Sequence, residues 1–119
     1  PTLLLHRSEW DKVCARRIIH GNYIFVYLLG QSRTQRKLIK KYAKDTGRKI
    51  VFLPHVEGHI RACDIGFGDI DLYDVDLSDF FSLIKHADMI ITDSFHAVVF
   101  SIILLYINNV NVYIIFINY

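Results

Sequence analysis

The chain has 119 residues, of which 52% are hydrophobic and 22% are charged. This length and composition suit one small domain with a buried core and exclude a disordered segment. The formal net charge of +2 gives no indication of a nucleic-acid or membrane-surface partner, so no nucleic-acid partner is expected. Cys14 and Cys63 lie far apart and lack CxxC spacing. Two reduced thiols in a cytoplasmic protein are the simplest interpretation.

The first half of the chain predicts a leading segment, a strand and a helix. Residues 1–21 form the leading segment, which includes a short helix capped by Ser8. Tyr23–Leu29 is a continuous apolar run whose β-branched and aromatic residues are typical of a strand buried on both faces. A helix is predicted to open at Ser32 or Gln31 and to run to about Thr46, with Gly47 as its C-cap. Its expected apolar face consists of Leu38, Ile39, Tyr42 and Ala43.

The second half predicts two more strands and two more helices. Ile50–Leu53 is a second buried strand, and residues 55–74 form a long, glycine-containing and charged loop of a kind that is often functional. A helix over Asp76–His86 precedes a third short strand, Met89–Thr92. A last helix is predicted over about residues 95–105.

Strands and helices alternate along the chain, which predicts right-handed βαβ crossovers. The expected fold class is therefore α/β, with a Rossmann-like parallel sheet flanked by helices. We place this domain at residues 22–107 and treat residues 108–119 as a divergent apolar tail.

Ligands of an open parallel sheet bind beyond the carboxyl ends of its strands. Three segments are expected at that edge: Gly30–Arg33, Pro54–Tyr73 and Asp93–Ala97. His96 is the strongest catalytic candidate, because an imidazole at a helix N-terminus can donate to an anion or move a proton near neutral pH. The alternative is a histidine that packs or hydrogen-bonds inside the fold.

Other polar residues have structural interpretations beside the functional ones. Asp93 and Ser94 are of the residue types that cap a helix. Arg61 and His55 are candidate contacts to an anion or a sugar, or else ordinary residues of a solvated loop. Arg33 belongs to a basic run. Because it lies near a strand end, it is the one residue of that run expected to reach a ligand. The other members are expected on the solvated face of their helix: Arg36, Lys37, Lys40, Lys41, Lys44 and Arg48.

Motifs of several common sites are missing from the sequence. It contains no GxGxxG, no GxxxxGK[ST] and no GxSxG, which argues against dinucleotide, P-loop and serine-hydrolase chemistry. The histidine, cysteine and acidic residues of the long loop do not have the spacing of a zinc motif, so no metal is expected.

Residues Asp74–Ile103 resemble the polysaccharide pyruvyl transferase family, whose pattern there is roughly DVGPEEFLSLIKNADYVITDSFHGTVFSI. This stretch contains the TDSFH segment, Thr92–His96. Upstream, Pro1–Trp10 resembles the family's DPTLLL opening and SEEW-like helix, and Tyr23–Gly30 resembles a YILVYLLG strand. The resemblance covers about residues 1–103.

The resemblance implies a chain similar to the C-terminal half of a two-domain transferase of the GT-B type, with the N-terminal half missing. Members of the family transfer a pyruvyl group from phosphoenolpyruvate to a pair of sugar hydroxyls in exopolysaccharide biosynthesis in the cytoplasm, and phosphate leaves. Phosphoenolpyruvate and a saccharide acceptor are therefore the expected partners, no cofactor is expected, and the isolated chain is expected to be inactive.

The family's Arg-Leu-His motif, which helps to hold phosphoenolpyruvate, aligns with Ser94, Phe95 and His96. His96 carries over, whereas Ser94 stands in the place of the arginine. Part of the anion binding is therefore expected from backbone N–H groups of Phe95 to Ala97, and Ala97 stands where the family commonly has glycine. The full set of expected substrate contacts is Ser94, Phe95, Ala97, Arg61, His55 and Arg33.

The tail after Ile103 departs from the family pattern. Asparagines interrupt its apolar stretch, so no stable membrane span is expected. A frameshift or truncation near Ile103 would explain the departure, and sequencing of the locus tests it. The alternative is a divergent final strand, Val110–Ile117. Two other functions stay open: a GT-B glycosyltransferase that uses a nucleotide-sugar, and a non-catalytic truncated remnant.

Overall fold

The structure is a computed structural model that describes residues 18–54, 60–73, 75–107, 109 and 112–117. In this part of the chain one sheet contains β1 (Tyr23–Tyr27), β2 (Lys49–Phe52), β3 (Ile70–Asp71), β4 (Met89–Thr92) and β5 (Tyr113–Phe116). The strands lie in the order β3-β2-β1-β4-β5, and every pairing is parallel. The helices are α2 (Arg33–Thr46), α3 (Leu77–His86), α4 (Phe95–Ile107) and the short 3₁₀ helix η2 (Ala62–Asp64).

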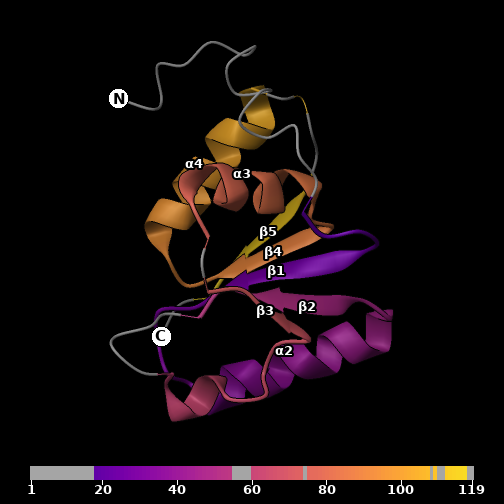
Figure 1. The fold of residues 1–119 in the computed structure, drawn as a ribbon, viewed down its shortest axis with the longest axis vertical. Helices are drawn as coiled ribbons and strands as arrows, with labels where there is room; N and C mark the ends of the chain where they lie inside the picture. Colours follow the sequence, from indigo (N-terminus) through magenta and orange to yellow (C-terminus); the bar gives the residue numbers. More distant parts are fainter. Residues whose placement is uncertain (1–17, 55–59, 74, 108, 110–111, 118–119) are drawn as a thin grey trace.

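Helix α2 covers one face of the sheet, and helices α3 and α4 cover the other (Figure 1). Side chains of successive strand residues point to opposite faces, so β1 contributes to two cores. Tyr23 and Phe25 pack in the cluster that includes Phe81 and Leu104, whereas the neighbouring residues of β1 pack in the cluster that includes Ile39. Burial on both faces explains the continuous apolar run, and the predicted α/β, Rossmann-like fold is confirmed.

Local sequence signals set the ends of two helices. The Ser32 hydroxyl accepts the N–H of Gln35 at 3.2 Å and begins α2, and Gly47 ends it in the left-handed conformation with φ 69°, which glycine adopts without strain. The carboxylate of Asp76 accepts the N–H of Asp79 at 2.8 Å and begins α3. These caps agree with the predicted helix bounds.

The predicted apolar face of α2 is half wrong. Ile39 and Ala43 are buried, but Leu38 is 64% exposed and Tyr42 is 39% exposed. Arg36, which was expected in solvent, is only 4% exposed. The face of α2 that meets the sheet therefore follows the spacing 36, 39 and 43, because a buried carboxylate accepts the arginine there.

The long loop and the tail both contribute to the sheet. Within the loop, η2 and β3 form, and β3 pairs with the end of β2 through Val51 and Phe52. In the tail, β5 pairs with β4 along its whole length. The tail therefore contains a strand, which lies within Val110–Ile117, the range of the alternative prediction of a final strand. Among the described helices, none is long and apolar enough to cross a membrane.

Candidate functional site

The carboxyl ends of β1 and β4 meet where the direction of the strand order changes. From β1 the chain passes through α2 to β2 on one side, and it returns through α3 to β4 on the other side. The two connections cover opposite faces of the sheet (Figure 1). Ligands of open α/β sheets bind at such a switch point. The segments that follow β1 and β4, residues 28–32 and 93–97, are therefore the candidate site.

Asp93 joins these two segments. Its Oδ1 accepts the N–H of Leu29 at 2.7 Å, and its Oδ2 accepts the N–H of Gly30 at 2.8 Å. Each bond is charge-assisted, and a carboxylate that accepts two backbone N–H groups fixes the loop against the strand end. By residue type Asp93 or Ser94 is expected to cap the helix, and Asp93 instead makes a tertiary contact.

Ser94 is the residue that caps α4. Its hydroxyl accepts the N–H of Ala97 at 3.2 Å, and its own N–H donates to the Thr92 hydroxyl at 3.0 Å. The Thr92 hydroxyl in turn donates to the carbonyl of Tyr27 at 2.7 Å. The side chain of Ser94 and the N–H of Ala97, both expected as substrate contacts, are therefore bonded to each other.

His96 and Phe95 lie in the first turn of α4, and both are exposed, Phe95 to 68%. Within the described part of the chain, no hydrogen bond engages the backbone N–H of either residue. Free N–H groups at a helix N-terminus carry partial positive charge and attract anions. The position that sequence analysis assigned to a catalytic histidine is thus open to solvent and next to the switch point.

Two arginines hold the carbonyl groups of the loop after β1. The guanidinium of Arg61 donates to the carbonyls of Leu29 at 2.6 Å, Leu28 at 3.2 Å and Gly30 at 3.2 Å. Arg36 donates from Nη2 to the carbonyl of Gly30 at 2.8 Å. The loop is therefore held on both sides, since Asp93 binds its N–H groups and the arginines bind its carbonyls.

Asp64 holds both arginines in place. Its side chain is fully buried, with Oδ1 2.9 Å from Nε of Arg36 and Oδ2 3.1 Å from Nε of Arg61. Four of the five N–H groups of Arg61 donate within the protein. Arg61, a predicted substrate contact, supports the loop through these bonds.

Arg33 belongs to the helix that follows β1, whereas His96 belongs to the helix that follows β4. Arg33 is exposed at the start of α2, on the face of the sheet opposite α4 (Figure 1). There it lines a cavity on the surface of α2 together with Lys37 and Lys40. His55 lies outside the described residues. The roles assigned to these side chains stay predictions.

Tyr27 is a polar residue near the candidate site that sequence analysis did not single out. Burial, and secondarily the negative charge of Asp93, raise the pKa of the Tyr27 phenol above 10.0. The phenol therefore keeps its proton at neutral pH. Its ring packs edge-on against Phe80, with 5.9 Å between centroids. Its position as the last residue of a buried strand was the available signal, because such residues lie at the ligand-binding edge.

In the described ranges, no three His, Cys, Asp or Glu side chains gather where they could hold a metal ion.

A family model described as "Polysaccharide pyruvyl transferase" matches residues 1–104. The chain belongs to this family. The match includes β1 to β4 and the first turns of α4, and hence both segments of the candidate site. It ends one residue beyond Ile103, the point at which the sequence resemblance was seen to stop. Comparisons with curated proteins and with solved structures found no match.

Proposed function

We propose that this polysaccharide pyruvyl transferase chain acts on phosphoenolpyruvate and transfers its pyruvyl group to a pair of hydroxyls of a saccharide. The observation that carries the proposal is the family match over residues 1–104, which includes the switch-point segment around His96. The exposed first turn of α4, with its N–H groups and imidazole, supports a role in binding an anionic donor.

The proposed reaction needs a proton donor and a cationic environment. Protonation of the methylene carbon of phosphoenolpyruvate develops positive charge at the adjacent carbon. One sugar hydroxyl adds there through its oxygen and loses its proton. The bond from that carbon to the phosphate oxygen then breaks, and the second hydroxyl takes the vacated position and loses its proton. The products are a cyclic ketal and inorganic phosphate, and no oxidant or reductant is consumed.

In this proposal His96 acts on the donor, either as the acid that protonates the methylene carbon or as a contact to the phosphate. The N–H groups of Phe95 and His96 provide the anion-binding positions that an arginine at position 94 would otherwise support. Asp93 and Arg61 are positioning residues, because they hold the adjacent loop and not the donor.

The test is calorimetric titration of the complete gene product that contains this chain. Phosphoenolpyruvate should bind, and His96→Ala should weaken its binding by about tenfold or more, as expected when a charge-assisted contact is lost. His20→Ala is the matched control, because His20 is exposed and precedes the opposite, amino end of β1. Equal binding by the two variants would remove His96 from the site. Binding of a nucleotide diphosphate-sugar, with no affinity for phosphoenolpyruvate, would favour glycosyl transfer instead.

A further inference from the structure

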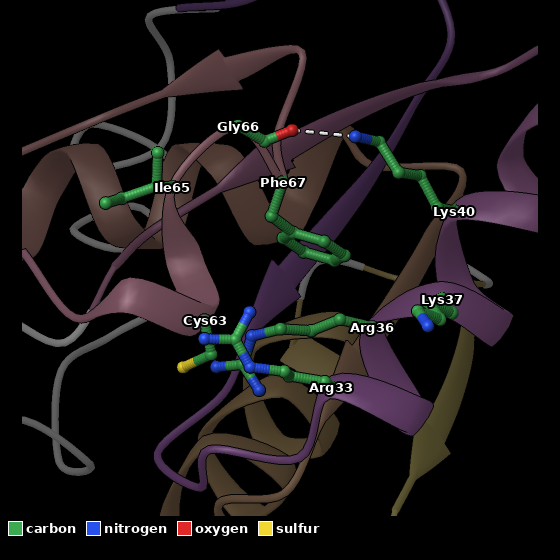
Figure 2. A pocket seen from close by; sticks show the side chains of 8 residues that line it. All are labelled: Arg33, Arg36, Lys37, Lys40, Cys63, Ile65, Gly66 and Phe67. Atoms are coloured by element: carbon green, nitrogen blue, oxygen red, sulfur yellow. Dashed lines mark hydrogen bonds between the residues drawn. The ribbon is translucent and has the colours of Figure 1, made fainter.

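A cavity of about 160 Å³ lies between α2 and the segment that follows η2. We call it the α2 cavity. Arg33, Lys37 and Lys40 line it from the helix, and Cys63 lines it from the opposite side (Figure 2). The buried ring of Phe67 and the buried guanidinium of Arg36 also line it, with the guanidinium carbon 5.9 Å from the ring centroid. It is thus a concave site with cationic side chains at its mouth and a buried interior.

The three exposed cations share one face of α2. Their spacing of four and three residues places them on successive turns. Like charges at such spacing repel each other and destabilise a helix. In α2 this repulsion is concentrated at the mouth of a cavity, where a bound anion would relieve it.

Part of the positive charge at the cavity, that of Arg33 and Lys37, has no acidic partner among the described residues. No acidic residue lines the cavity, and the nearby carboxylate of Asp64 is buried between Arg36 and Arg61. Lys40 donates from Nζ to the carbonyl of Gly66 at 2.7 Å (Figure 2), and its charge also acts on the carboxyl of Asp71.

We propose that the α2 cavity binds a phosphate group. A guanidinium presents a planar pair of N–H donors, and an ammonium group adds a compact charge, which together suit a dianion with several acceptor oxygens. Arg33 and Lys37 are the principal contacts, and Lys40 stands at the far end of the row. The cavity lies on the face of the sheet that α2 covers, whereas His96 belongs to α4 on the other face (Figure 1). Phosphate binding in the cavity does not depend on the proposed function.

Binding is tested on the complete gene product with inorganic phosphate and, separately, with a hexose 1-phosphate, at constant ionic strength. The test variant is Arg33→Gln/Lys37→Gln. The charge-matched control is Lys41→Gln/Lys44→Gln, which changes two exposed residues of the same helix that do not line the cavity. We expect the test pair to lose affinity about tenfold or more and the control pair to keep it. The ligand with the higher affinity shows whether the cavity prefers free phosphate or a phosphate carried on a saccharide.

Cys63 provides a readout confined to this cavity, which separates it from phosphate bound near His96. In a Cys14→Ser background, Cys63 is alkylated with uncharged iodoacetamide, with and without phosphate. Phosphate should slow the alkylation several-fold, also in His96→Ala, and should have no effect in Arg33→Gln/Lys37→Gln. Alkylation that is independent of phosphate, or protection that persists in the double variant, would overturn the proposal.

Discussion

Replacement of Asp64 by asparagine should be among the most destabilising single changes in this fold. The Asp64 carboxylate is fully buried and lies 2.7 Å from Nη2 of Arg36 and 3.1 Å from Nε of Arg61. Asparagine has nearly the same shape but no charge. The substitution therefore leaves the side chains of Arg36 and Arg61, 4% and 10% exposed, without their common anion.

The magnitude follows from the cost of an unpaired buried charge. Removal of one partner of a buried ion pair costs about 3–5 kcal/mol, which is a large share of the about 5–15 kcal/mol by which a domain is stable. With a slope of about 2 kcal/mol/M, the urea midpoint should fall by about 2 M. The change Arg61→Met should cost less than Asp64→Asn, because Asp64 then keeps its contacts to Arg36.

Urea unfolding followed by circular dichroism measures both losses. Asp45→Asn is the matched control, because it removes the same charge from an exposed position on α2 and should shift stability by no more than about 0.5 kcal/mol. The triple change Arg36→Met/Arg61→Met/Asp64→Leu should recover part of the loss, since an apolar replacement of a whole buried ion cluster is often neutral. A loss below about 1 kcal/mol for Asp64→Asn would refute the structural role given to this carboxylate.

Three further changes test other parts of the structure. Asp93→Asn should cost about 1–3 kcal/mol and should speed hydrogen exchange at the amides of Leu29 and Gly30, the groups that the carboxylate accepts. Ser94→Ala removes the cap of α4 and should cost about 1 kcal/mol in urea unfolding. Asp71→Asn should raise the melting temperature near neutral pH. Burial, and then the charges of neighbouring acids, raise the pKa of the Asp71 carboxyl above 3.8. The folded state therefore holds this proton more tightly than the unfolded state, and wild-type stability falls as pH rises through the raised pKa.

Each of these changes has an outcome that contradicts its reasoning. Unchanged amide exchange in Asp93→Asn would mean that the loop after β1 is held by other contacts. A loss of stability in Ser94→Ala as large as that of Asp64→Asn would point to a role beyond capping. The gain from Asp71→Asn should disappear below about pH 3.8, the ordinary pKa of the group. A gain that is the same at all pH values would show that it does not come from the carboxyl's charge.

The strands and helices were largely predictable because their signals are local. Tyr23–Tyr27 and Met89–Thr92 form continuous apolar runs of strand length, as burial on both faces requires. Ser32 and Gly47 begin and end α2 through contacts within a few residues. Such signals are contained in short stretches of sequence, so they can be recognised without knowledge of the tertiary structure.

The support of the candidate site was not predictable, because it joins residues far apart in the chain. Arg36 belongs to a basic run typical of a solvated helix face, and only its pairing with Asp64, 28 positions later, explains its burial. Asp93 has the residue type and position of a cap, yet its partners are 63 and 64 positions earlier. Local propensity favoured the capping interpretation, and the geometry of the sheet edge favoured the tertiary contact.

The central claim is pyruvyl transfer with His96 acting on the donor, and acceptor-dependent release of phosphate tests it most directly. Complete gene product, phosphoenolpyruvate and a saccharide acceptor should release phosphate and form the ketal, detected by mass spectrometry of the product. Release should stop without acceptor. It should fall by about a hundredfold or more in His96→Gln, as expected for loss of a general acid, and stay unchanged in His20→Gln. Ketal formation at the wild-type rate in His96→Gln, or no ketal from the wild type with a range of saccharides, would contradict the account.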